Sequence, residues 1–234
     1  MQALSPEKII VALDTSTPLQ AAFWLDALVP PLTHAKIGLE LFTACGPSIF
    51  DRLARPNLHF FLDLKLHDIP TTVARTIQTL AQHPIKFLTL HASGGLSMLQ
   101  AAKEATAGTS IRLLAVTVLT SIDEATCQQI YPGTSTTQDQ VLRLAELAQK
   151  AGLDGLVCSP LEIQALRARF DRTFILVTPG IRASAHEKST IDDQSRTMPA
   201  RKALEAGADY LVVGRPLTRA ESPRDALAKM LQEP

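Results

Sequence analysis

Residues 59–72 read His-Phe-Phe-Leu-Asp-Leu-Lys-Leu-His-Asp-Ile-Pro-Thr-Thr. Apolar side chains alternate along the first part of this stretch, which predicts a strand over 59–66 with Asp63 and Lys65 on one face. The opposite face is apolar and consists of Phe60, Leu62, Leu64 and Leu66. A carboxylate, an ammonium and then the carboxylate of Asp68 are costly to hold at the end of an apolar strand unless they are paired or used.

Two interpretations of these charges are open. An isolated Asp-x-Lys is best explained as a structural ion pair that ties the end of a strand to its neighbour. A catalytic group is the alternative, and the rest of the chain favours it. After the charges, Ile69-Pro70 breaks the strand and Thr71-Thr72 opens a helix.

Short apolar runs recur along the chain, each followed by a helix-like segment, the pattern of repeated βα units. Strands are predicted over 9–14, 35–42, 59–66, 87–92, 112–119, 155–159, 174–179 and 210–214. Helices are predicted near 18–28, 46–54, 71–82, 95–106, 138–151, 161–168, 199–206 and 219–232. Eight such units without a linker predict a single (β/α)8 TIM barrel domain over residues 1–234, with an open doubly wound sheet as the alternative.

Polar residues gather at the predicted strand ends, where barrels of this type carry their chemistry. They are Asp14, Asp63, Lys65, His91, Thr120, Arg182, Gly214 and Arg215. Lys36 differs because it lies near the beginning of the predicted strand 35–42, with Gly38 and Glu40 on the same face. This many polar strand ends together indicate one site for a polar, anionic ligand.

The last strand and the loop before it indicate a phosphate. Gly214 lets backbone N–H groups approach phosphate oxygens, and Arg215 can bind them with two parallel hydrogen bonds. The polar segment 181–198 is long for a loop in a compact domain, and we interpret it as a lid over the phosphate, with a merely mobile loop as the alternative.

Composition excludes several classes of protein. Lys plus Arg equals Asp plus Glu at 23 each, so no basic field for nucleic acid or membrane binding is present, and only 5% of residues are aromatic. Three cysteines without C-x-x-C spacing, no signal peptide and no membrane-spanning apolar run predict a soluble cytoplasmic protein.

Neither a P-loop nor a Rossmann glycine motif is found. His67 and His91 could bind a metal, but Lys65 would repel a cation there, so hydrogen bonding is the better interpretation.

Taken together, these motifs resemble the orotidine 5′-phosphate decarboxylase family over nearly the whole chain. They are the segments 11–14, 36–42, 63–70, 91–95, 119–121, 179–182, 193–194 and 213–216. The Asp-x-Lys-x-x-Asp core by itself is shared with related sugar-phosphate decarboxylases. Its combination with Lys36 and the later strand-end motifs is specific. The segment between Arg182 and Gln194 is longer than in short members of the family.

The resemblance implies an activity and a role for each matching residue. The activity is decarboxylation of orotidine monophosphate to uridine monophosphate, without cofactor or metal, in a homodimer with shared active sites. Lys65 would protonate C6 of the pyrimidine, Asp63 would lie beside the substrate carboxylate, and Lys36 would complete the charged array. The other implied contacts are those of Asp68 and Thr72 with the neighbouring subunit's site, Asp14 with the ribose, Thr120 with the pyrimidine, and Gln194, Gly214 and Arg215 with the phosphate, with Arg182 nearby.

Three other functions remain as alternatives. A magnesium-dependent sugar-phosphate decarboxylase would share the barrel, and a Schiff-base aldolase could use Lys65 as its nucleophile. A barrel that binds phosphosugars without turnover is the non-enzymatic alternative. None of the three explains the charges of the 63–68 stretch together with Lys36 and the phosphate motif.

Overall fold

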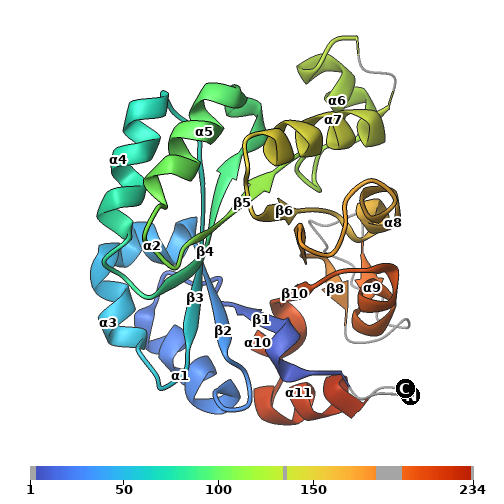
Figure 1. The fold of residues 1–234 in the computed structure, drawn as a ribbon. Coiled ribbons are helices and arrows are strands. Elements are labelled where there is room, and N and C mark those ends of the chain that lie inside the picture. The colour runs from blue at the N-terminus through green and yellow to red at the C-terminus, as the bar shows by residue number, and fades with distance from the viewer. Residues whose placement is uncertain (1–3, 134–135, 183–196, 233–234) are drawn as a thin grey trace.

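A computed structural model describes residues 4–133, 136–182 and 197–232. Within these ranges eight parallel strands close into a barrel in the order β1-β10-β7-β6-β5-β4-β3-β2, surrounded by helices (Figure 1). The barrel strands are β1 (Ile9–Ala12), β2 (His34–Gly38), β3 (His59–Leu66), β4 (Ile85–His91), β5 (Arg112–Val116), β6 (Gly155–Val157), β7 (Ile175–Thr178) and β10 (Tyr210–Val213). The predicted (β/α)8 barrel is therefore confirmed, and the open sheet is excluded.

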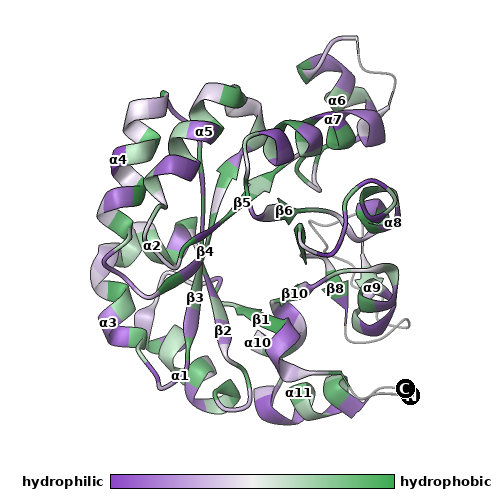
Figure 2. Cartoon of the chain, viewed as in Figure 1, coloured by the Kyte–Doolittle hydropathy of each residue, from purple (hydrophilic) through white to green (hydrophobic). Residues whose placement is uncertain are grey.

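Helices connect the strands and cover the outside of the barrel. They are α1 (Pro18–Leu28), α2 (Leu39–Cys45), α3 (Ile49–Leu53), α4 (Pro70–Leu80), α5 (Gly95–Ala105), α6 (Glu124–Ile130), α7 (Thr137–Lys150), α8 (Ile163–Arg167), α9 (Ala200–Ala206), α10 (Arg215–Thr218) and α11 (Pro223–Gln232). Short 3-10 turns are η1 (Pro6–Lys8), η2 (Gly46–Ser48), η3 (Ala92–Gly94) and η4 (Pro160–Glu162). The outer helices carry hydrophilic and hydrophobic residues in alternation, as expected of helices that pack one face on a barrel (Figure 2).

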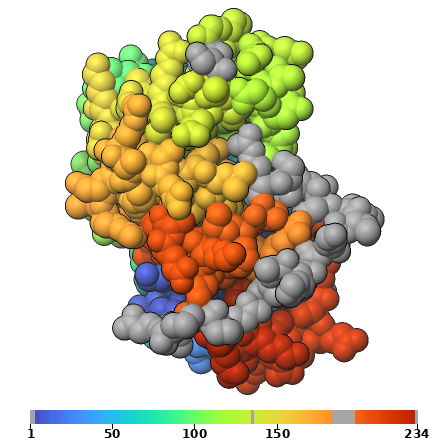
Figure 3. All heavy atoms as spheres, turned by 90° about the vertical axis from the view of Figure 1, so that its right-hand side faces the viewer, coloured from blue at the N-terminus to red at the C-terminus, as the bar shows by residue number. Residues whose placement is uncertain are grey.

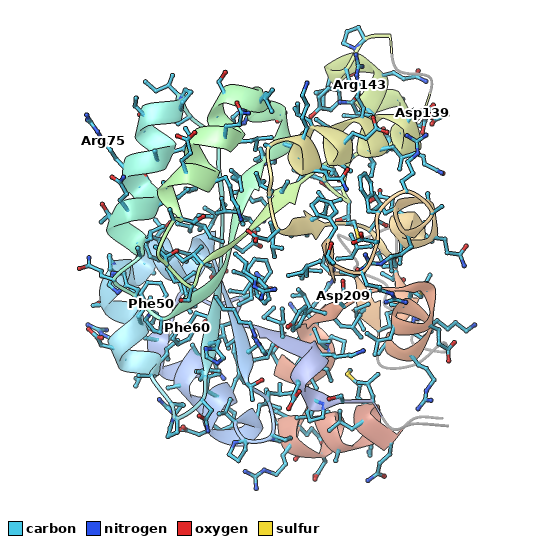
Figure 4. The ribbon with its side chains drawn as sticks, in the orientation of Figure 1. Phe50, Phe60, Arg75, Asp139, Arg143 and Asp209 are labelled. Carbon is cyan, nitrogen blue, oxygen red and sulfur yellow. The ribbon has the colours of Figure 1, made fainter. Side chains whose placement is uncertain are left out.

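Two apolar layers hold the barrel together. One fills its interior and includes Ile10, Phe61, Phe87 and Leu114. The other lies between strands and helices, where Phe50 of α3 contacts Phe60 of β3 with ring centroids 5.5 Å apart (Figure 4). Because successive strand residues point to opposite sides, neighbours such as Phe60 and Phe61 belong to different layers.

Helix α8 is tied to the strands beneath it. The Arg167 guanidinium pairs with the Asp209 carboxylate, which also accepts a hydrogen bond from the Leu176 N–H at 2.8 Å. Asp209 lies just before β10 (Figure 4), and α8 and α9 are neighbours on the face shown in Figure 3. This contact fixes the N-terminal ends of β7 and β10 against the helical layer.

The second predicted strand is partly wrong. It was expected over 35–42, but β2 ends at Gly38 and the chain continues as α2 (Leu39–Cys45). Leu41 of this helix is buried, whereas Leu39 is 56% exposed, so the apolar residues beyond Gly38 do not continue the inward and outward alternation of a strand. Lys36 is consequently the middle residue of β2, and not a residue near the beginning of a longer strand.

Helix α6 was not predicted. It begins after Asp123, whose carboxylate accepts a hydrogen bond from the Thr126 N–H at 2.8 Å. This N-cap was readable in the sequence as an aspartate followed by Glu124, but the helix is short and buries mainly Cys127, so its apolar periodicity is weak.

Candidate active site

Four charged side chains form a continuous row across the C-terminal ends of β1, β2 and β3. Lys36 Nζ lies 2.9 Å from Asp14 Oδ1 and 3.7 Å from Asp63 Oδ2. Lys65 Nζ lies 2.8 Å from Asp63 Oδ1 and 2.9 Å from Asp63 Oδ2. The strand registers produce this row, because Ala12 pairs with Lys36 and Gly38 pairs with Asp63. Carboxylates and ammonium groups thus alternate, and the predicted array of Asp14, Lys36, Asp63 and Lys65 is present.

The backbone of Lys65 is in the left-handed region, with a φ of 50°, which non-glycine residues adopt at a cost. The pairing of β3 with β4 is irregular between Leu62 and Leu66, so this residue stands out of the regular ladder. Thr89 of β4 compensates, because its Oγ1 accepts a hydrogen bond from the Lys65 N–H at 2.9 Å. The same hydroxyl donates to Asp63 Oδ1 at 2.9 Å, so one side chain positions both charged residues.

Electrostatics keep Asp63 ionised. Burial by itself would raise the pKa of its carboxyl, but Lys36 and Lys65 lower it, with hydrogen bonds from Lys65 and Thr89 adding to their effect. The net pKa of Asp63 lies below its ordinary value. The site therefore holds a buried negative charge between two ammonium groups.

Two histidines lie near this row. The ring centroids of His67 and His91 are 5.6 Å apart. Burial first, then His67 and Lys65, lowers the pKa of His91, and Asp63 opposes this shift. This shift favours the neutral form of the His91 ring. The expected hydrogen-bonding role of the two histidines stays a prediction.

Two glycines border the row and leave space for it. A Cβ on Gly38 would lie 3.1 Å from Lys36 Nζ, and one on Gly214 would lie 3.7 Å from Asp14 Oδ2. The start of α10 after β10 is thereby placed beside the ribose-binding candidate Asp14, and Arg215 is the first residue of that helix. The predicted phosphate residues Gly214 and Arg215 thus lie at the same end of the barrel as the charged row.

Among the other residues predicted to contact the substrate, the structure describes Thr120 and Arg182 but not Gln194. Thr120 follows β5 and is partly buried, and Arg182 lies in β8 (Ile181–Arg182), which pairs with β9 (Met198–Pro199). Both ends of the 181–198 segment are thus anchored together. Gln194 and the rest of 183–196 lie outside the described residues, so the lid stays a prediction.

Asp68 and Thr72 are exposed and are not part of the ion-paired row. They line a pocket of about 350 Å³ whose wall also includes Lys65 and Thr76. The Asp68 carboxylate accepts a hydrogen bond from the Ile69 N–H at 2.7 Å, and it forms no ion pair with any residue that the structure describes. The role of these two residues in a neighbouring subunit stays a prediction.

Thr89 was missed in the sequence. It is fully buried, yet its hydroxyl is the link between the backbone of Lys65 and the carboxylate of Asp63. A signal existed, because Thr89 and His91 share a face of β4 whose other residues, Ile85 and Phe87, are apolar. A threonine on a strand is common, however, and only the pairing with β3 gives it this meaning.

Within 4–133, 136–182 and 197–232, no group of three or more His, Cys, Asp or Glu side chains is arranged to hold a metal ion. In the same ranges, helices that are both long and apolar enough to cross a membrane are absent.

Known proteins are similar to this chain in sequence and in fold. A sequence model of the "Orotidine 5'-phosphate decarboxylase / HUMPS family" matches residues 7–230. Proteins named orotidine 5'-phosphate decarboxylase are similar at 46% identity in Actinobacillus pleuropneumoniae serotype 5b (223 residues, 94% of this chain and 95% of that protein) and 48% in Nitrosococcus oceani (227 residues, 96% of each). The crystal structure of orotidine 5'-phosphate decarboxylase from Lactobacillus acidophilus has a TM-score of 0.83 at 36% identity, covering 97% of this chain and 100% of that one. The chain belongs to the orotidine 5'-phosphate decarboxylase / HUMPS family.

Proposed function

We infer that this chain is a carboxy-lyase that converts orotidine 5′-monophosphate to uridine 5′-monophosphate and carbon dioxide in pyrimidine biosynthesis. The observation that carries the inference is the row of Asp14, Lys36, Asp63 and Lys65, found in a chain 46–48% identical to proteins named for this activity. The family description also covers a second type of enzyme, but these relatives are all decarboxylases by name.

The chemistry explains why such a row is useful. Loss of carbon dioxide from C6 leaves an electron pair on an sp² carbon with no conjugated carbonyl to accept it. Catalysis then depends on charges already in place around the developing carbanion. We assign Lys65 as the ammonium that stabilises this carbanion and protonates it. Both oxygens of Asp63 hold Lys65 Nζ at 2.8 and 2.9 Å, so little reorganisation is needed at the moment of reaction.

Asp63 and Lys36 have complementary roles in this proposal. The ionised Asp63 lies beside the substrate carboxylate and disfavours that charge, which departs with carbon dioxide. Lys36 bridges Asp63 and Asp14, and so connects the reacting end of the site to the end that we assign to the ribose. The scheme uses no cofactor and no metal.

The phosphate lies at the other end of the proposed complex. Gly214, Arg215 and Gln194 bind it, Arg182 lies near it, and Thr120 contacts the pyrimidine. Phosphate contacts remote from C6 can contribute to the transition state as well as to affinity, because they fix the base against the charged row. The position of Gly214 beside Asp14 supports this arrangement.

We further propose a homodimer in which Asp68 and Thr72 enter the partner's site. Both are exposed on the pocket that Lys65 also lines. Apolar residues next to site residues are exposed as well: Ile69, after Asp68, is 64% exposed, and Leu39, after Gly38, is 56% exposed. Apolar exposure beside a polar site is typical of an interface.

The activity is tested by following the ultraviolet absorbance of orotidine monophosphate with EDTA present. Rapid loss of the orotate chromophore supports decarboxylation without a metal, and Lys65→Ala is expected to abolish it. Lys103→Ala is the matched control, because Lys103 also contacts both oxygens of one carboxylate, that of Asp154 at 3.0 Å, outside the site. Normal turnover by a folded Lys65→Ala variant would contradict the assignment.

The same assay separates the alternatives. Activity that disappears with EDTA favours the magnesium-dependent decarboxylase, and trapping of substrate on Lys65 by borohydride favours the aldolase. Binding of uridine monophosphate without turnover of the orotate nucleotide favours a barrel without catalysis.

Shared sites are tested by mixing two inactive variants. A heterodimer of Asp68→Ala and Lys65→Ala chains has one site free of both substitutions if Asp68 acts across the interface. Partial recovery of activity is expected, and verified heterodimers without activity would count against sharing. Sedimentation of the wild-type chain gives the subunit number independently.

We also propose that residues 1–234 form one catalytic domain that works in the cytoplasm. A single cooperative unfolding transition that abolishes activity supports one domain, and separate transitions would contradict it. Cell fractionation tests the location.

A further inference from the structure

A second polar pocket lies at the N-terminal end of the barrel, away from the charged row. It has a volume of about 230 Å³, and its wall includes Glu7, Thr33, His34, His59, Lys86 and Tyr210. His34, His59 and Tyr210 are the first residues of β2, β3 and β10, so the opening faces away from the end that carries Lys65. The decarboxylation mechanism uses none of these side chains.

Aromatic rings pack around His34 in this pocket. The buried ring of His34 lies 5.4 Å from that of Tyr210 and 6.1 Å from that of Phe87, measured between centroids. Phe87 and Tyr210 contact each other at 5.1 Å, and the Lys86 ammonium lies over both rings at 5.6 and 5.8 Å. The Lys86 ammonium and the His34 ring therefore pack on the aromatic rings of Phe87 and Tyr210.

The hydrogen bonds define the protonation state of His34. Lys86 Nζ is 3.0 Å from His34 Nε2, and because an ammonium only donates, Nε2 accepts. His34 Nδ1 then carries the proton and donates to Thr33 Oγ1 at 2.9 Å. His34 is neutral in this arrangement. Its ring carries no negative charge that could balance the positive charge of Lys86.

The positive charge of this pocket is not matched by a close carboxylate. Lys86 forms no ion pair within 4.0 Å among residues 4–133, 136–182 and 197–232. Arg112, the first residue of β5, adds a second cation, and the exposed Glu7 on the rim is the carboxylate that opposes them. Burial first, then Arg112, lowers the pKa of Lys86. An anion bound near Lys86 and Arg112 would offset the repulsion between these two positive charges.

We propose that this pocket binds a small oxyanion, of the size and charge of sulfate or phosphate, with Lys86 as its principal partner. His59 and Tyr210 line the same pocket, and their side chains can donate further hydrogen bonds. The volume corresponds to about eight waters at about 30 Å³ each, enough for an oxyanion with part of its hydration. Such an ion would stabilise the fold by mass action, since it binds the native state.

The affinity of the pocket for the anion should depend on pH. The charged groups around the pocket are Lys86, Arg112 and Glu7, with Asp209 paired to Arg167 beside Tyr210. Burial and Lys86 lower the pKa of His59, and burial lowers that of His34 to about 4. An anion favours the protonated form of His59, so affinity should rise as pH falls through the range in which His59 titrates. Sulfate is the probe, because its own charge does not change in this range.

The test is a sulfate titration of the wild-type chain, followed by NMR of the histidine ring C–H signals against chloride at matched ionic strength. Saturable shifts of His34 and His59 are expected, assigned with His34→Gln and His59→Gln. His67 and His91 report separately on any sulfate at the catalytic end. Lys86→Met, which keeps the aliphatic stem, should weaken sulfate binding about tenfold or more, as for a lost charge-assisted hydrogen bond.

Two outcomes would overturn the proposal. One is a wild-type protein whose His34 and His59 signals do not respond, or respond equally to chloride. The other is a folded Lys86→Met variant with unchanged affinity for sulfate. Lys86→Gln provides the same comparison if the methionine variant does not fold, and thermal unfolding without ligand verifies the fold of each.

Discussion

Thr89→Val tests how the protein holds Lys65 and Asp63 in place. The substitution keeps the shape of the side chain and removes the hydroxyl that accepts from the Lys65 N–H and donates to Asp63 Oδ1, each at 2.9 Å. A hydrogen bond to a charged group contributes about 1.5–3 kcal/mol and a neutral one about 1 kcal/mol. The free energy of unfolding should therefore fall by about 2.5–4 kcal/mol.

Activity should fall as well, because Lys65 would lose the contact that holds its left-handed backbone. A displacement of about 1 Å in a catalytic group can cost on the order of 100-fold in rate. We expect kcat to fall about tenfold to 100-fold, with a smaller change in KM because the phosphate end is untouched. Urea unfolding followed by circular dichroism gives the first quantity, and the absorbance assay gives the second.

Thr117→Val is the matched control. Thr117 is 2% exposed, and its hydroxyl has no hydrogen-bond partner among the residues that the structure describes. The same chemical change there should leave kcat unchanged and leave stability equal or higher, since an unsatisfied buried hydroxyl is removed. Equal losses in both variants, or wild-type stability and kcat in Thr89→Val, would refute the reasoning.

Three further predictions follow from single contacts. Folding lowers the pKa of His34 from 6.5 to about 4, so the free energy of unfolding should fall by about 3 kcal/mol as the pH decreases from about 6.5 to about 4. Urea titrations at each pH measure this decrease, and His34→Gln should lack this part of it. Gly155→Ala places a Cβ 2.1 Å from the Ile175 carbonyl oxygen and should cost about 3 kcal/mol or more of stability by thermal unfolding; a wild-type melting temperature would contradict the close approach. Arg215→Ala should raise KM about tenfold or more with a smaller change in kcat, and unchanged kinetics would exclude its phosphate role.

Local pattern was enough to predict much of the barrel. Alternation over 59–66 reproduces β3, and it placed Asp63 and Lys65 on one face because a strand has a period of two. Helix α7 was equally clear, since Val141, Leu142, Ala145 and Ala148 form one apolar face and are all buried. A hydrophobic pattern over neighbouring residues predicts the right element when the tertiary packing favours that same element.

Local pattern failed where two tendencies compete. The residues after Gly38 are apolar enough for a strand, yet they form α2. Lys36 was therefore expected near the beginning of a longer strand, whereas it is the middle residue of β2. Its part in the site was expected. Short segments carry too little periodicity to separate strand from helix, and the contacts of Leu41 in the core decide between them.

The sequence by itself determined the barrel, the face that Asp63 shares with Lys65 and the resemblance that suggests a decarboxylase. The tertiary structure alone decided that Asp14, Lys36 and Asp63 meet within hydrogen-bond or ion-pair distance, because their spacing depends on the registers between β1, β2 and β3. It also decided the backbone of Lys65 and the role of Thr89, which arise from an irregular pairing with β4. Residues far apart in the chain are brought together by closure of the barrel and packing of its core, and no local pattern encodes those distances.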